Sequence, residues 1–300
     1  MNRHIVLKNI FKKLSLLVLV FFTMAFGYKR IDYRHGMYNN VCKDLKNNVL
    51  VYFVFVDSKV TSPWTEFDIQ TTIDSMEVAV NWLEKKAGEN NIALNIISDY
   101  YIGNEYTTVR KNLPYETVEK SATTPNLSKG TEALNDWADK IALRVGKEVQ
   151  IKEKDGIPEI KNPNNKERLV AHLRDSKQVE SVALLFMVNN YYRDDISLTV
   201  NQLGSEDVEF AIVSYKYPAI IAQNILNLFG AADLSKSLYR RNEQKIRHAQ
   251  EYFPSDIMQD VYARSLNTLE IGAYTKYLIG WESRLDPKYQ PLLTDNIVNF

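Results

Sequence analysis

The apolar run over residues 49–56 constrains the fold of this chain more than any other segment. It reads VLVYFVFV, so every position is branched or aromatic and none is polar. A strand with one solvent-exposed face alternates apolar and polar residues, whereas a strand buried on both faces is apolar throughout. The run therefore predicts a central strand with further layers on both sides of its sheet.

A helix and a second strand are expected directly after this run. Ser62 and Pro63 form a helix start, and the helix is expected to stop near Gly88. Between them, an apolar stripe at helical spacing consists of Ile69, Ile73, Met76, Val80 and Leu83. A strand is predicted over 92–97. Strand, helix and strand in this order indicate a parallel crossover, so we expect an α/β (α+β) fold with a mixed twisted sheet and a backing helix.

The remainder of the chain extends this organisation to one domain over 48–300. Residues from about 103 to 178 are less regular and are expected to form an insertion. It would hold a helix ended by Gly146 and a second helix over 167–176. Further strands are expected over 182–188, 196–200 and 208–215. Pro218 then opens a helical segment, and the C-terminal part is expected to be mostly helical.

Composition and charge fit an ordinary globular protein without a nucleic-acid partner. The chain has 300 residues, 45% of them hydrophobic and 25% charged, with a formal net charge of zero. It carries no stripe of Arg and Lys with interleaved aromatic residues, the footprint that nucleic-acid binding requires. It also lacks the G-x-S-x-G elbow of serine hydrolases and the Gly-rich phosphate loop.

The N-terminus has the pattern of an export signal. A basic opening through Lys13 runs into the apolar stretch 14–27, which has the length of a signal-peptide core and is short for a bilayer span. Ala25 and Gly27 supply the small residues before a cleavage site. We expect residues 1–27 to be a cleaved signal peptide or, alternatively, a retained N-terminal anchor. Either one places the body of the protein outside the cytoplasmic membrane, with any membrane contact through this segment alone.

Residues 28–47 are polar without a clear period and are expected to be a spacer. Cys42 lies in this stretch and is the one cysteine of the chain, so no intramolecular disulfide can form. A lone exported thiol could be a nucleophile, but in this flexible N-terminal region we expect Cys42 to be a bystander.

A degenerate metal-binding pattern lies at residues 223–234. In the zinc-protease motif H-E-x-x-H-x-x-G-x-x-H/D, the two His are four residues apart and project from one helix face. The Gly lets the chain turn, and the last residue returns as the third ligand. Gly230 and Asp233 occupy the turn and third-ligand positions. Gln223, Asn224 and Asn227 replace the first His, the Glu and the second His.

These replacements remove the chemistry of the motif. A catalytic zinc ion needs about three protein ligands, and only Asp233 remains. Amide oxygens suit harder cations, and Asn224 cannot act as a general base. We therefore expect no catalytic residue, no bound metal and no cofactor.

The pattern resembles the secreted metzincin-like zinc metallopeptidases, particularly the bacterial type whose active-site helix runs into Gly-Ala-x-Asp-Leu. Met258, in the stretch Ser255-Asp256-Ile257-Met258, falls where the family has a methionine-containing turn, and a short apolar helix is expected within 269–281. The resemblance implies a zincin-like fold in which a strand leads directly into the active-site-type helix. It also implies that strands within 182–215 could hold an extended peptide by backbone pairing.

Three hypotheses about function follow. The first is an exported, catalytically inactive metallopeptidase homologue, a pseudoenzyme that binds a peptide or protein. The second is an active metal-dependent peptidase with a displaced site drawn from Asp233, Glu243, His248 and Glu251. The third is an unrelated exported α/β interaction protein. A structure with residues 218–229 away from any sheet edge or cleft would favour the third.

Overall fold

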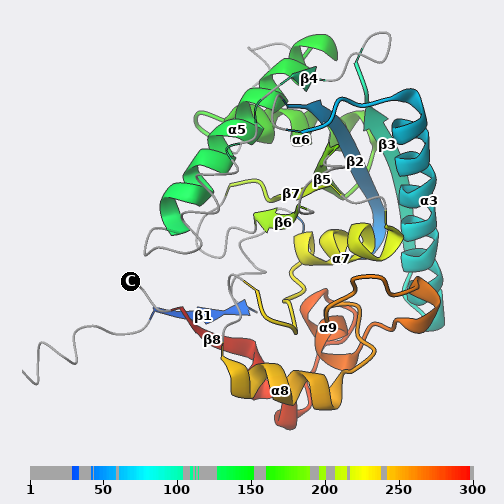
Figure 1. Ribbon diagram of the computed structural model, residues 1–300, viewed down its shortest axis with the longest axis vertical. Coiled ribbons are helices and arrows are strands. Elements are labelled where there is room, and N and C mark those ends of the chain that lie inside the picture. The colour runs from blue at the N-terminus through cyan, green and yellow to red at the C-terminus, as the bar shows by residue number, and fades with distance from the viewer. Residues whose placement is uncertain are drawn as a thin grey trace, which may run out of the picture.

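The chain folds around one mixed sheet, seen in a computed structural model (Figure 1). The structure describes residues 29–33, 42, 44–58, 61–103, 109–110, 112, 114, 127–151, 160–189, 196–200, 207–214, 217–237 and 242–297. The predicted signal segment over 1–27 lies outside these ranges. Within them, no helix is both long enough and apolar enough to span a bilayer.

The sheet has the strand order β3-β2-β5-β7-β6, and β4 (Val109–Arg110) pairs with the end of β2. Its strands are β2 (Asn47–Asp57), β3 (Leu94–Tyr101), β5 (Ser181–Val188), β6 (Ser197–Val200) and β7 (Phe210–Val213). All neighbours pair in parallel except β6, which is antiparallel to β7. The mixed α/β class and the central position of the apolar run are thus confirmed.

Helices cover both faces of this sheet, as the continuous apolar run requires. Successive side chains of β2 point to opposite faces. Phe53 and its alternate neighbours pack in a core cluster with α3 (Glu66–Glu89) and α7 (Pro218–Leu228). Val54 and its alternate neighbours pack in a second cluster with α5 (Leu127–Glu148) and α6 (Asn165–Lys177). Figure 1 shows α3 on one side of the sheet and α5 on the other.

The backing helix α3 begins later than the sequence predicts. The residue that caps it is Thr65, whose hydroxyl accepts a hydrogen bond from the Asp68 amide at 3.1 Å. Ser62 and Pro63 precede the helix, because a cap that satisfies an otherwise unpaired amide fixes the start more strongly than Pro does. The far end agrees with the prediction to within a residue or two, since α3 ends at Glu89.

The described helices of the expected insertion over 103–178 pack on the sheet. Its helices α5 and α6 bury Trp137, Leu169 and their neighbours against the second face of the sheet. Gly146 lies inside α5, whose last residue is Glu148. The apolar faces of both helices thus pack against the sheet.

The described residues of the predicted spacer belong to the body of the protein. β1 (Lys29–Asp32) pairs antiparallel with β8 (Thr294–Ile297), and Tyr33 and Leu45 are buried in the core. Cys42 is buried too, and its thiol donates a hydrogen bond to the Val182 carbonyl at 3.0 Å. Burial raises the pKa of the Cys42 thiol, with a further contribution from Glu209. Cys42 is a core residue held as a neutral thiol, which corrects its expected place in a flexible region.

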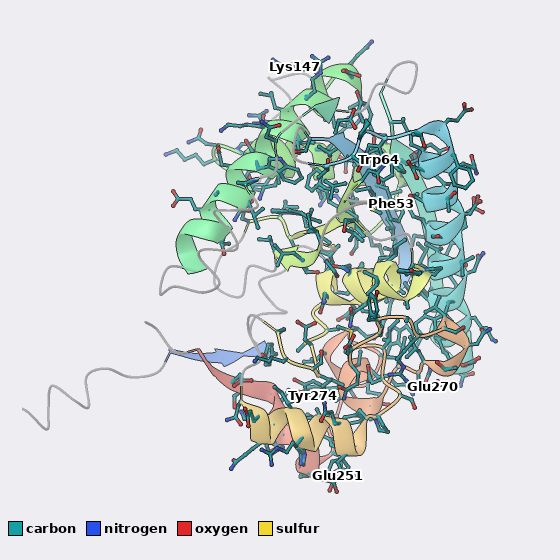
Figure 2. All side chains as sticks on the ribbon, in the orientation of Figure 1. Phe53, Trp64, Lys147, Glu251, Glu270 and Tyr274 are labelled. Atoms are coloured by element: carbon teal, nitrogen blue, oxygen red, sulfur yellow. The ribbon has the colours of Figure 1, made fainter. Side chains whose placement is uncertain are left out.

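The C-terminal part is less helical than predicted. It contains α8 (Glu243–Tyr252), η2 (Leu266–Thr268), α9 (Ala273–Leu278) and η3 (Pro287–Leu293). Of the expected helix within 269–281, only α9 forms. Glu270, labelled in Figure 2, connects this part to the rest, because it pairs with Lys86 of α3 at 2.7 Å. Within the part, the buried Tyr274 hydroxyl donates to the Leu292 carbonyl at 2.8 Å.

Asp256 fixes the loop before η2 to the start of α9. Its carboxylate accepts hydrogen bonds from the Met258 amide, the Gly272 amide and the Thr275 hydroxyl at 2.8, 2.8 and 2.9 Å. Burial raises the pKa of Asp256 to about 6, although these donors and the nearby Lys276 favour the charged form. The loop that carries Met258 is therefore held by a buried acid.

Candidate functional site

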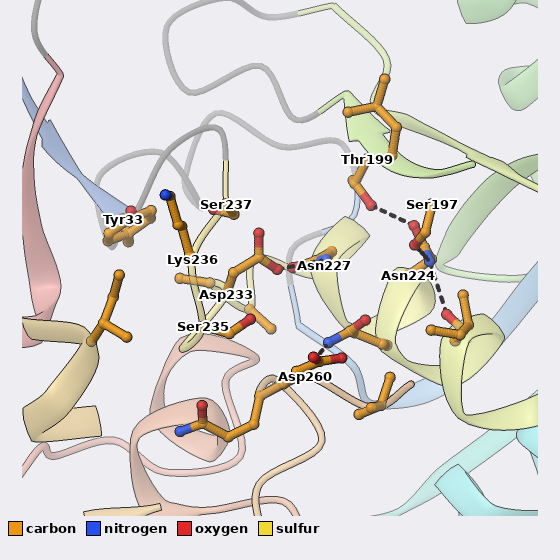
Figure 3. A pocket seen from close by; sticks show the side chains of 18 of the residues that line it. Tyr33, Ser197, Thr199, Asn224, Asn227, Asp233, Ser235, Lys236, Ser237 and Asp260 are labelled. Atoms are coloured by element: carbon orange, nitrogen blue, oxygen red, sulfur yellow. Dashed lines mark hydrogen bonds between the residues drawn. The ribbon is translucent and has the colours of Figure 1, made fainter. Parts of the chain in front are cut away.

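A cavity of about 720 Å³ lies between the edge strand β6 and the helix α7 (Figure 3). We call it the motif cavity, since residues of the 223–234 pattern line it. Its other walls are formed by residues of the segment 235–237, by α8, by the loop 259–261 and by Tyr33. The helix predicted to carry the motif thus lies at a sheet edge and beside a cavity.

The positions of the second and third ligands of the motif meet in this cavity. α7 starts with Pro218 at its first turn and ends at Leu228. Gly230 then adopts φ +94°, a left-handed conformation that glycine accepts without strain. The chain turns there and brings Asp233 back, so that the Asn227 amide donates to the Asp233 carboxylate at 3.3 Å. The convergence of these two positions expected from the spacing is present, and an amide–carboxylate hydrogen bond joins them.

The first-ligand position has a different set of partners. The side-chain nitrogen of Gln223 donates to the carbonyls of Ile257 and Gln259, both at 2.9 Å. These two carbonyls flank Met258, which is buried and accepts a hydrogen bond from the Leu234 amide at 2.8 Å. The Met258 loop therefore lies directly against the 223–234 segment.

Asn224 is tied to the edge strand. It is 1% exposed and accepts a hydrogen bond from the Thr199 hydroxyl at 3.0 Å. Its amide nitrogen donates to the Ser197 hydroxyl and to the Ile220 carbonyl, both at 2.8 Å. At the position of the catalytic Glu, the chain has a saturated structural amide.

The acidic and imidazole groups of the displaced-site hypothesis do not gather. Among the described residues, no group of three or more His, Cys, Asp and Glu side chains is placed to hold a metal ion. The His248 ring packs on Tyr252, with centroids 4.7 Å apart, and its Nε2 lies 3.2 Å from the Lys288 carbonyl. Glu243 pairs with Arg247 on the surface of α8.

Several residues of the site were not singled out in the sequence. Ser197 and Thr199 are two apart in a strand, so period-two spacing could have placed both hydroxyls on one face. Tyr33 and Asp260 also line the motif cavity, but they come from distant parts of the chain. No local pattern identifies such residues.

Comparisons of the chain with protein-family models, with curated proteins and with solved structures found no match.

Proposed function

We propose that this protein is an exported, catalytically inactive relative of the zinc metallopeptidases, which binds an extended peptide along β6 in the motif cavity. The observation that carries the proposal is the meeting of Gln223, Asn227 and Asp233 in one cavity beside an edge strand. A core helix that merely ends in Gly would need neither a cavity beside it nor the hydrogen bond from Asn227 of the helix to Asp233.

The geometry of β6 supports peptide binding by strand addition. In the described part of the chain, β6 pairs with β7 on one side only. The Ser214 amide donates to the Ile196 carbonyl at 2.7 Å, so residues 196, 198 and 200 direct their main-chain groups toward β7. The alternate residues Ser197 and Thr199 direct theirs to the open edge. A peptide added there would find paired donors and acceptors.

The lack of hydrolytic chemistry follows from the side chains at the motif. Gln223 and Asn227 supply neutral amides in place of imidazoles, and zinc prefers nitrogen and sulfur ligands to amide oxygens. The Asn224 amide cannot accept a proton at ordinary pH, so it cannot act as a general base. Two of its hydrogen bonds are made with residues of β6. Binding without turnover is the activity that these groups support.

A zinc graft tests the kinship with zinc peptidases. In the double variant Gln223→His, Asn227→His, the two imidazoles and Asp233 would complete a three-ligand site. We expect the variant to retain about one zinc ion per chain in competition with a chromogenic chelator, whereas the parent retains none. Adding Asp233→Asn should weaken zinc binding by about tenfold or more. A correctly folded double variant without zinc affinity would contradict the kinship.

Peptide binding is tested separately with a random peptide library selected on the chain starting at Tyr28. We expect selected peptides to bind without being cleaved and to lose binding to Thr199→Pro. Proline at this edge position removes the outward N–H, and its ring blocks an incoming strand, while the pairing of β6 with β7 does not use that N–H. Equal binding to Thr199→Pro would rule out strand addition on β6.

A further inference from the structure

We infer that Asn224 is a positioning residue for peptide recognition: it holds Ser197 and Thr199 in the conformation that presents their main-chain groups to a ligand. The inference rests on the proposed function and assigns a role to the position that lost its catalytic Glu. It concerns how β6 is held rather than what is bound.

The contacts of Asn224 are directed at one short strand segment. Its amide nitrogen donates to the Ser197 hydroxyl at 2.8 Å, and its carbonyl oxygen accepts from the Thr199 hydroxyl at 3.0 Å (Figure 3). Both hydroxyls lie on the face of β6 toward α7, because residues two apart in a strand share a face. One side chain of the helix thus bonds both residues of that face.

An amide suits this position, whereas a carboxylate does not. The second donor of Asn224 bonds the Ile220 carbonyl at 2.8 Å, so both amide hydrogens and the oxygen are used. A carboxylate has no hydrogen to give to that carbonyl, and a charge at a position only 1% exposed would lack a partner. The site therefore requires a group that both donates and accepts.

The two residues held in this way are the two that face the open edge. The main-chain groups of Ser197 and Thr199 point away from β7, while their side chains are bonded to Asn224. β6 has four residues and pairs only with β7 among the described strands, and the two side-chain bonds to Asn224 connect it to α7 as well. Fixing its conformation before binding lowers the entropy that a ligand must overcome.

We call the hydrogen bonds of Asn224 to the Ser197 and Thr199 hydroxyls the two tethers of β6. The test compares the removal of a tether with the removal of an equivalent threonine hydroxyl elsewhere. Thr199→Val removes the bond to Asn224 and keeps the branched shape, and Asn224→Leu removes both tethers. Thr72→Val is the matched control, because Thr72 is a buried threonine of α3 whose hydroxyl bonds the Asp68 carbonyl at 2.7 Å and does not contact β6. The probe is a peptide selected from the library, and amide hydrogen exchange is followed at residues 197–200.

We expect Thr199→Val and Asn224→Leu to raise the Kd of the selected peptide by about tenfold, mainly through faster dissociation. Exchange should accelerate at 197–200 and stay unchanged in β2, whereas Thr72→Val should leave both the Kd and the exchange of β6 unchanged. If Asn224→Leu fails to fold, Thr199→Val gives the result alone. Peptide binding that is equal in the parent and Thr199→Val would overturn the positioning role and leave the proposed function standing. No peptide binding by the parent would overturn both.

Discussion

At the scale of single residues, Gly272 shows how closely the Asp256 loop is packed. A Cβ added at Gly272 would lie 2.6 Å from an Asp256 carboxylate oxygen and 2.8 Å from a ring carbon of Phe253. Both neighbours are buried, and Asp256 is held by its three donors. Neither side chain can therefore move away from an added Cβ without losing packing contacts or hydrogen bonds. The requirement for glycine here is one of space and cannot be recognised from local sequence.

We therefore predict that Gly272→Ala lowers the free energy of unfolding by about 1–3 kcal/mol, measured by denaturant titration. Gly88→Ala is the matched control, since a Cβ at Gly88 in α3 would meet nothing within 4 Å. That change should stabilise the protein by up to about 1 kcal/mol through helix propensity. Equal effects of the two substitutions would contradict the close packing at Gly272.

Asp256 should also make stability depend on pH. Its pKa is raised by burial from 3.8 to about 6, so the folded state binds more protons than the unfolded state between these values. Its contribution to stability is complete below about pH 4 and is lost as pH rises through about 6, by an amount on the order of 3 kcal/mol.

The measurement that isolates Asp256 is the difference in unfolding free energy between the parent and Asp256→Asn. An asparagine keeps the size of the side chain and does not titrate. The advantage of the parent should be largest near pH 4 and should shrink toward pH 7. A difference that stays constant over this range, or grows with pH, would show that Asp256 is not held with a raised pKa.

At the scale of elements, α6 illustrates how a helix start is fixed by sequence and then tied to the fold. Asn164 accepts a hydrogen bond from the Glu167 amide at 2.9 Å, and Glu167 accepts one from the Asn164 amide at 2.6 Å. This reciprocal capping box is readable in sequence. The Asn164 side chain also donates to Asp207, just before β7, at 2.8 Å, a contact that the sequence does not reveal.

We predict that Asn164→Ala destabilises the protein by about 1–2 kcal/mol in denaturant titration, because it removes both the cap and the bond to Asp207. Asn164→Ser keeps an oxygen for the cap and removes only the link to Asp207, so it should cost less. If the two variants are equally destabilised, the cap contributes nothing measurable.

At the scale of the whole molecule, the first and last described strands, β1 and β8, lie side by side. β1 pairs with β8, and Tyr33 is buried immediately after β1. We predict that a chain starting at Tyr28 matches the stability of a chain that keeps residues 1–27. A chain starting at Arg34 should lose about 2–3 kcal/mol, since it lacks the strand pairing and the burial of Tyr33. Equal thermal midpoints for the chains starting at Tyr28 and Arg34 would show that this pairing does not stabilise the fold.

Sequence reasoning succeeded where the determining interactions are local or periodic. The apolar run over 49–56, the stripe of α3 and the turn at Gly230 each specify a structure through residues close together in the chain. It did not identify the long-range partners of residues within 28–47 and 103–178. Cys42 and Tyr33, for example, pack in a core whose other members come from the sheet, from α3 and α7 and from the C-terminal part.

The sequence alone determined the α/β class and the absence of metal-binding side chains at Gln223, Asn224 and Asn227, because each depends on residue type and spacing. Only the tertiary structure decided that these residues border a cavity at a sheet edge and that Asn224 bonds Ser197 and Thr199. Those relations join segments that meet through strand pairing and core packing, and no spacing along the chain encodes them.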